Sequence, residues 1–124
     1  MAVTPDRRDH EALDSMLRQP EWKLHKATSL TKAVSKLNRT HSIRVVLCER
    51  DLQSDSWRQL LSHLSHLDHP PLLIVMSNLA DERLWAEALN LGAYDVLSKP
   101  FDPQEVTRSL KSAWRRHSGR VFSN

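Results

Sequence analysis

The stretch Leu91-Gly92-Ala93-Tyr94-Asp95-Val96-Leu97-Ser98-Lys99-Pro100-Phe101-Asp102 decides how the fold of this chain is predicted. Its middle, residues 96–98, is a short apolar run that follows a glycine and an alanine and stops at Lys99 and Pro100. Asp102 can then cap the amino terminus of a helix, and Glu105 follows three residues later, as in a capping box. The stretch therefore predicts a strand, a polar strand end and the start of the last helix.

Two longer, mostly apolar runs precede this stretch, at residues 43–48 and 72–76, and the second follows two prolines. Neither run alternates strictly between apolar and polar residues, and both are too short for helices. Such runs are typical of strands that are buried on both faces of a parallel sheet. Residues 22–27 do alternate, which predicts an edge strand.

Helical apolar stripes fill the gaps between these strands. They comprise Ala12, Leu13, Met16 and Leu17; Leu30, Ala33, Val34 and Leu37; Trp57, Leu60, Leu61 and Leu64; Leu84, Ala88 and Leu91; and Val106, Leu110, Ala113 and Trp114. Regular alternation of strands and helices favours parallel strands with helices on both faces of the sheet. We predict a doubly wound α/β domain over residues 1–117, followed by a tail at residues 118–124.

The composition is that of one globular domain: 124 residues, 40% hydrophobic, 27% charged, with a net charge of +3. The single cysteine, Cys48, cannot form an internal disulfide, which favours a reducing, cytoplasmic compartment. The longest uninterrupted apolar run, residues 72–76, is far shorter than the roughly 20 residues that cross a membrane. We therefore expect a cytoplasmic protein that does not span a membrane.

Polar residues follow three of the predicted strands: Glu49, Ser77 and Lys99. In open α/β sheets, ligands bind outside the carboxyl ends of the strands. An ammonium group neutralises charge and a hydroxyl donates a hydrogen bond, so these residues would suit a phosphoryl group. Each residue taken alone could also be no more than the polar end of a strand.

The stretch at residues 91–102, together with residues 45–49, Leu52 and Asp55, resembles a response-regulator receiver domain of the CheY-like kind. The resemblance extends from about residue 3 to residue 116 and implies two-component (phosphorelay) signal transduction. It implies a flavodoxin-like sheet of order 2-1-3-4-5. It also implies a phospho-accepting aspartate after the third strand, a serine or threonine after the fourth, a lysine after the fifth and a cis bond before Pro100.

The acceptor position departs from the family, because Glu49 stands where the aspartate is expected. Leu52 matches the apolar position three residues later, which disfavours an alternative register with Asp51 as the acceptor. Glutamate moves the carboxylate by about 1.5 Å, and a misplacement of about 1 Å can cost roughly a hundredfold in rate. The permanent negative charge of glutamate mimics only part of the charge that phosphorylation adds, which is roughly −1.5 to −2.

The acidic pair by which the family holds Mg²⁺ would fall within residues 2–5, and none of these is acidic. Asp6 is the only carboxylate close by, whereas Mg²⁺ needs one or two well-placed carboxylates besides phosphate, so we expect no cofactor. Only residues 1–3 precede the first helix, so the first strand is expected to be truncated. We expect upstream chain, or residues 120–123 from the tail or from a second protomer, to fill its place.

Other side chains are candidates for contacts or metal ligation. Tyr94 lies two residues before Val96, on the same side of a strand, and could replace the family's aromatic switch residue. Trp85 neighbours Leu84 on the fourth helix and is a candidate anchor for a protein partner. His63 and His66 share a helix face but His69 does not, and no cysteine or carboxylate completes a metal site there.

We therefore predict a pseudo-receiver that is not an enzyme and acts by contact with a histidine kinase, an output protein or a second protomer, as a homodimer. Two alternatives stay open: a functional phosphoacceptor on Asp51 or Glu49, and a basic nucleic-acid-associated domain. The second rests on six lysines and arginines, and no acid, between Lys23 and Arg44. Their irregular spacing argues against a binding stripe.

Overall fold

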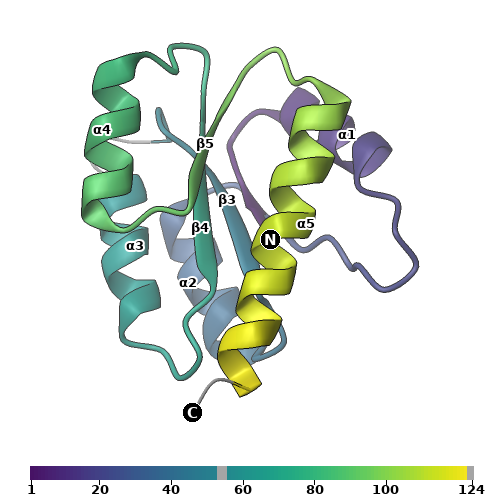
Figure 1. Ribbon diagram of the computed structural model, residues 1–124, viewed down its shortest axis with the longest axis vertical. Helices are drawn as coiled ribbons and strands as arrows, with labels where there is room; N and C mark the ends of the chain where they lie inside the picture. The colour runs from purple at the N-terminus through teal and green to yellow at the C-terminus, as the bar shows by residue number, and fades with distance from the viewer. Residues whose placement is uncertain (53–55, 123–124) are drawn as a thin grey trace.

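The computed structural model describes residues 1–52 and 56–122, with side chains for all of these except residues 56 and 120–122; Asp55 lies outside the described residues. Strands and helices alternate along the chain as β1 (Ala2–Val3), α1 (Arg7–Met16), β2 (Lys26–Ala27), α2 (Leu30–Arg39), β3 (Val45–Glu49), α3 (Ser56–Ser65), β4 (Leu72–Ser77), α4 (Glu82–Leu91), β5 (Asp95–Ser98) and α5 (Pro103–Phe122). The strands form one parallel sheet in the order β2-β1-β3-β4-β5. Figure 1 shows β3 and β4 side by side between the helices. This strand order confirms the predicted flavodoxin-like α/β fold.

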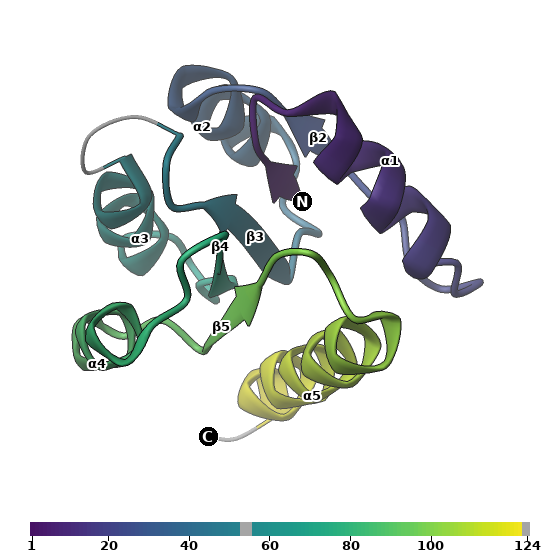
Figure 2. The ribbon, with the colours of Figure 1, turned by 90° about the horizontal axis from the view of Figure 1, so that it is seen from above.

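The helices cover both faces of the sheet, with α1 and α5 on one side and α2, α3 and α4 on the other (Figure 2). Every residue of β3 is buried, and successive residues face opposite layers. Val46 and Cys48 pack in the core under α2, α3 and α4, whereas Val45 and Leu47 pack in the core under α1 and α5. Burial on both faces explains why the central strands are continuous apolar runs.

The central strand β1 is short but present, as expected for a truncated strand. Ala2 and Val3 pair with β2 on one side and with β3 on the other. The amino group of Met1 extends the ladder by donating to Val45 O at 2.8 Å, and Leu47 N donates to Met1 O at 2.8 Å. Burial, followed by the charge of Lys36, lowers the pKa of this amino group to about 5.

Two expectations about this part of the sheet are wrong. The edge strand predicted over residues 22–27 is limited to Lys26–Ala27, because its neighbour β1 offers only two residues for pairing. In addition, α5 continues past His117 to Phe122, so residues 118–122 extend the helix and do not form a separate tail. Residues 120–122 therefore do not add a strand beside β1 in the same chain; Gly119 lowers helix stability by about 1 kcal/mol relative to alanine but does not end the helix.

Local sequence features determine both ends of α4 and the start of α5. Asp81 caps the amino terminus of α4 by accepting from Leu84 N at 2.9 Å. The carboxyl terminus of α4 is capped by Gly92 at φ 109°, a left-handed conformation that glycine adopts readily. Leu91, predicted to join the buried stripe of this helix, is 52% exposed because the backbone turns away directly after it. Asp102 accepts from Gln104 N at 3.0 Å at the start of α5.

Candidate functional site

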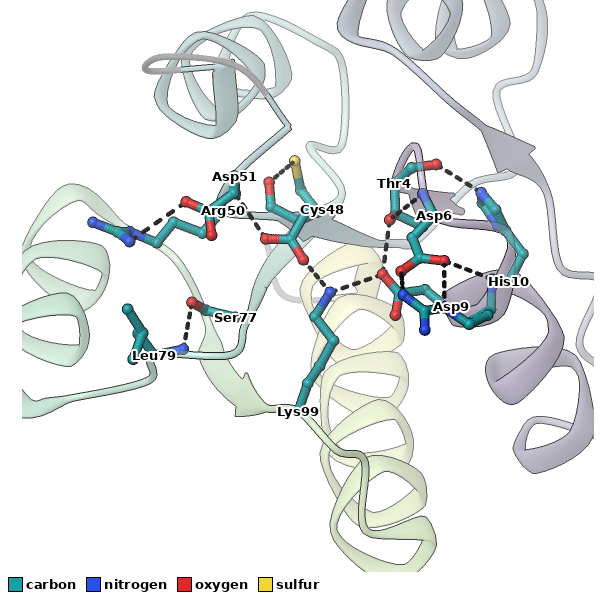
Figure 3. Close-up of polar contacts among 12 residues, drawn as sticks. Thr4, Asp6, Asp9, His10, Cys48, Arg50, Asp51, Ser77, Leu79 and Lys99 are labelled. Atoms are coloured by element: carbon teal, nitrogen blue, oxygen red, sulfur yellow. Dashed lines mark hydrogen bonds and ion pairs between the residues drawn. The ribbon is translucent and has the colours of Figure 1, made fainter.

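The carboxyl ends of β3 and β5 bring Glu49 and Lys99 together. Figure 3 shows Lys99 pointing toward Asp9 of α1. Glu49 is the last residue of β3, and Lys99 follows β5, where the Lys99–Pro100 peptide bond is cis. The Lys99 ammonium donates to Glu49 Oε1 and also to Asp9 Oδ2, the latter at 2.8 Å. All three side chains are about nine-tenths buried, with exposures of 8–10%. The centre of the site is thus a buried cation between two carboxylates.

Asp9 is the residue that the sequence analysis missed at this site. It lies in the first turn of α1 and also accepts from Thr4 Oγ1 at 2.8 Å. A signal was available, because Asp9, Leu13 and Leu17 are spaced by four residues on one helix face and all three are buried. A carboxylate on an apolar helix face needs a charged or hydrogen-bonding partner, since aspartate is almost never fully buried unpaired.

Asp6, the carboxylate that the sequence analysis considered instead, lies outside this cluster. Its Oδ1 accepts from Arg8 N at 2.8 Å as the cap of α1, and its side chain also pairs with the Arg8 guanidinium. Hydrogen bonds from the Arg8 side chain and backbone lower the pKa of Asp6. Asp6 therefore begins the helix that carries Asp9 into the core.

The two carboxylates set the charge state of Lys99. Burial acts to lower the pKa of Lys99, but hydrogen bonds to Asp9 and Glu49, together with their negative charges, outweigh it, so the pKa is raised above its usual value. With all three groups ionised, the cluster carries one net negative charge. Loss of one member of a buried ion pair typically leaves a strongly destabilising uncompensated charge.

The second oxygen of Glu49 is also engaged. Glu49 Oε2 accepts from Asp51 N at 2.7 Å, which closes a turn directly after β3. The Asp51 side chain is exposed and lies 3.5 Å from the Arg50 guanidinium. Glu49, and not Asp51, is therefore the carboxylate that faces Lys99 at the end of this strand.

Ser77 ends β4 at the same edge of the sheet as Glu49 and Lys99, and among the described residues no hydrogen bond joins its hydroxyl to either side chain. It is fully buried at the end of β4, where its hydroxyl accepts from Leu79 N at 3.0 Å (Figure 3). Only the backbone of Ser77 contacts Lys99, through Lys99 N donating to Ser77 O at 2.9 Å. Serine side chains bond readily to backbone N–H groups two residues ahead, and in this local turn the Ser77 oxygen acts as the acceptor.

Tyr94 does not share a side of β5 with Val96, so that expectation is wrong. Tyr94 precedes the strand in a bend, and alternation of side chains applies only within the strand. Its ring packs in the layer of α1 and α5, and its hydroxyl bonds to Ser112 of α5. Val96 is buried in the opposite layer, under α4.

The remaining candidates lie away from this cluster. Trp85 is half-buried on α4, packed against the layer of α2, α3 and α4. Within residues 1–52 and 56–122, no three histidine, cysteine, aspartate or glutamate side chains form a group that could hold a metal ion. In the same part of the chain, no helix combines the length and apolar character needed to cross a membrane.

The basic residues between Lys23 and Arg44 are partly used within the fold. Lys26 pairs with Asp14, and Lys36 Nζ donates to Lys26 O at 2.7 Å. The Arg44 guanidinium lies over the Trp114 ring, 4.3 Å from its centroid, on α5. These contacts divide the positive charge between two sides of the molecule.

Comparison with known proteins places the geometry in a family. The sequence pattern of the response regulator receiver domain matches residues 5–111. Over 58 residues, 47% of this chain, the sequence is 34% identical to the transcriptional regulatory protein FixJ of Bradyrhizobium diazoefficiens. This match covers only 28% of the length of that relative.

Solved structures share the fold over nearly the whole chain. The signal receiver domain of an HD domain-containing protein from Pseudomonas fluorescens Pf-5 superimposes with a TM-score of 0.86 at 24% identity, over 99% of this chain and 90% of that chain. A CheY-like response regulator receiver domain protein from Methanospirillum hungatei JF-1 gives a TM-score of 0.81 at 17% identity, over 96% of this chain and 94% of that chain.

Proposed function

The chain belongs to the response regulator receiver domain family, and we propose that it is an atypical member, a pseudo-receiver that signals through protein contact and not through phosphorylation. The observation that carries this proposal is the Lys99 ammonium held between Glu49 and Asp9. A fixed carboxylate thus holds the lysine that a phosphorylated receiver would direct toward its phosphoryl group.

The engagement of Glu49 supports a carboxylate that does not act as a nucleophile. One of its oxygens accepts from Lys99 and the other from Asp51 N. An attack on a phosphodonor would break at least one of these contacts inside a buried cluster, and removing a charged hydrogen bond there costs about 1.5–3 kcal/mol. The exposed Asp51 carboxylate lies outside the cluster, and its ion-pair partner among the described residues is Arg50, not a lysine.

The donor set does not suit the Mg²⁺ that the family implies. Asp9 and Glu49 are the carboxylates in position, and the ammonium group that both contact lies between them. Mg²⁺ would need these oxygens in near-octahedral geometry, and the Lys99 ammonium already contacts both carboxylates and offsets one of their two charges. We therefore assign no metal-dependent step to this protein.

Protein partners are favoured by the surface around α4. Leu79 and Leu89 are 67% and 45% exposed, and the half-buried Trp85 lies on the same helix as Leu89. Aromatic and aliphatic side chains of this kind anchor protein interfaces. The partner is a histidine kinase, an output protein or a second copy of the chain, in the cytoplasm, and the protein is not an enzyme.

Incubation with acetyl phosphate and Mg²⁺, followed by intact mass measurement, tests the proposal. A receiver with an aspartate acceptor is the positive control, and the Asp51→Asn variant identifies any modified residue. We expect no added phosphoryl group on the wild-type chain. A stable added group would overturn the proposal; if Asp51→Asn abolishes it, the acceptor is Asp51, and if it persists, Glu49 is the residue to examine next.

Two further measurements separate the partner classes. A mass in solution that rises with protein concentration, and falls in the Leu89→Asp variant, indicates a homodimer through α4. Retention on DNA that weakens steeply with salt would support the nucleic-acid alternative, because phosphate contacts release counterions. We expect no such retention.

A further inference from the structure

The outward face of α5 carries a stripe of positive charge, formed by Arg108, Lys111 and Arg115. These residues are spaced by three and four positions, so their side chains share one face of the helix. Arg108 and Arg115 are exposed and Lys111 is half-buried. The buried face of the helix lies on the opposite side and comprises Val106, Leu110, Ala113 and His117. The stripe therefore points away from the sheet, and Figure 1 shows α5 running along the outside of the molecule.

The cations of this α5 stripe are unpaired in the part of the chain that the structure describes. Among residues 1–52 and 56–122, no hydrogen bond or ion pair involves the side chain of any of the three. Helix α2 is also rich in lysine and arginine, but there Lys32 donates to Thr28 Oγ1 and Arg39 donates to Ser35 O. The cations of α2 are thus used within the chain, whereas those of the α5 stripe are available to a partner.

The stability of α5 itself does not account for the stripe. Like charges three or four residues apart destabilise a helix. Positive charge is favourable near the carboxyl terminus of a helix, but this effect is confined to the last turn. Arg115 lies about two turns before Phe122, the last residue of α5. The stripe therefore opposes helix formation without an internal benefit, as expected of a binding surface.

A shallow groove of about 560 Å³ runs along the stripe. Besides the three cations, its lining comprises Pro103, Gln104, Thr107 and Ser112, and none of these described residues is aromatic or acidic. Single-stranded nucleic acids stack their bases on aromatic rings, and membranes take up apolar side chains. The groove offers neither kind of contact, so it fits a polar partner of negative charge.

An acidic protein segment fits the stripe better than a nucleic acid does. The stripe spans about 10 Å along the helix axis, at a rise of 1.5 Å per residue. Carboxylates three and four residues apart on a partner helix repeat at the same spacing, and arginine binds a carboxylate through two parallel hydrogen bonds. Strong electrostatic binding to DNA neutralises about 6–10 phosphates, which is more than three cations can contact.

We propose that the α5 stripe binds an acidic helix of a partner protein, whose carboxylates pair with Arg108, Lys111 and Arg115. This inference rests on the proposed function, in which the chain acts by protein contact, and it adds the charge of the partner. The same stripe of a second copy does not fit, because a symmetric contact would bring like charges together. Since α5 and α4 lie on opposite sides of the sheet, the contact is separate from the surface around α4 (Figure 2).

Titration of the ¹⁵N-labelled chain with a helical peptide tests the proposal. The peptide carries glutamates at the spacing of Arg108, Lys111 and Arg115, and its isomer has the same glutamates spread around the helix. We expect the aligned peptide to shift backbone amide signals of α5 and the isomer to bind about tenfold more weakly, because it forms fewer of the ion pairs at once. Binding of the aligned peptide should weaken as the salt concentration rises.

A charge-matched pair of variants separates the stripe from the overall charge of the protein. The variant with Arg108→Gln and Arg115→Gln removes two cations of the stripe and should weaken binding of the aligned peptide about tenfold. The variant with Lys32→Gln and Arg39→Gln lowers the net charge equally on α2. It should stay within about twofold of the wild type at physiological ionic strength, where distant charges are screened.

Several outcomes would overturn the proposal: no shift at millimolar aligned peptide, equal affinity for the two peptides, or equal losses in the two variants. Tighter binding of a DNA duplex that is lost in the α5 variant would also overturn it and assign the stripe to nucleic acid. The comparison of the two peptides uses the wild-type chain and so does not depend on the folding of a variant. A phosphoryl group added by acetyl phosphate would instead overturn the proposed function, and the peptide titration distinguishes that failure from this one.

Discussion

The two ends of the same parallel sheet differ in how far their polar groups are satisfied. At the carboxyl end, Lys99 donates to both Glu49 and Asp9. Thr4 donates to the same oxygen of Asp9, and Asp51 N donates to the second oxygen of Glu49. At the amino end, a cavity remains and the Trp22 indole N–H has no partner in the part of the chain that the structure describes.

The short β1 strand links these two ends. After Thr4 the chain enters α1 almost at once, which brings Asp9 over the end of β3, while on the other side of Ala2 the Met1 amino group donates to Val45 O. Open α/β sheets usually bind ligands at the carboxyl ends of their strands. Here the ends of β3 and β5 are closed by internal charge pairing, and the cavity beside Trp22 lies at the other end of the sheet.

The Lys99→Met substitution should change the stability of the protein more than any other substitution at the two ends of the sheet. It leaves Asp9 and Glu49 buried without their cation, so the free energy of unfolding should fall by about 3–5 kcal/mol. Urea denaturation followed by tryptophan fluorescence measures the change. Lys32→Met, at an exposed position, is the control and should stay within about 0.5 kcal/mol of the wild type. A loss below about 1 kcal/mol for Lys99→Met would mean that the cluster is not a coupled buried network.

A double-mutant cycle on Asp9 and Glu49 tests whether the two carboxylates share one cation. Asp9→Asn or Glu49→Gln alone leaves one carboxylate opposite Lys99, so each should cost about 1.5–3 kcal/mol, the range for one hydrogen bond to a charged group. The double variant leaves the lysine buried without a counter-charge, and a coupling of about 0.5–3 kcal/mol beyond the sum of the single losses is expected. Additive losses, measured by the same urea denaturation, would contradict a shared role.

The opposite end of the sheet should respond to a larger side chain with a gain in stability. Leu24→Phe adds volume at the wall of the cavity and should raise the free energy of unfolding by about 0.5–2 kcal/mol, as cavity-filling substitutions commonly do. Ala113→Leu, in the closely packed core under α5, is the matched control and should lose about 1–3 kcal/mol. A loss of similar size in both variants would show that the cavity is closed in solution.

The smallest expected effect is a dependence of stability on alkaline pH. The pKa of Lys99 is raised above 10.5 in the folded chain, so its contribution is fully present below pH 10.5 and is lost as the pH rises through the folded value. The free energy of unfolding should therefore decline above pH 10.5, and this decline should be smaller in Lys99→Met. Equal alkaline profiles for the two chains would argue against the charge-paired lysine.

Local patterns in the sequence were sufficient to predict the architecture. Uninterrupted apolar runs predicted strands buried on both faces, and β3 is buried throughout. Asp102, predicted as the cap at the start of the last helix, accepts from Gln104 N. The positions of Glu49 and Lys99 at the ends of their strands were likewise predictable, because adjacent residues determine where a strand ends.

Only the tertiary structure decided which side chains meet. Asp9 joins Lys99 from a helix ninety positions earlier in the chain, and this meeting depends on how α1 packs on the sheet. Tyr94 faces α5 because it precedes β5, and β2 is two residues long because β1 offers it no more partners. The periodicity of a segment predicts which of its faces is buried, but it does not predict how long the neighbouring strand is. The sequence by itself thus determined the strands, helices and strand ends, whereas packing determined the closed charge cluster and the cavity at the opposite end.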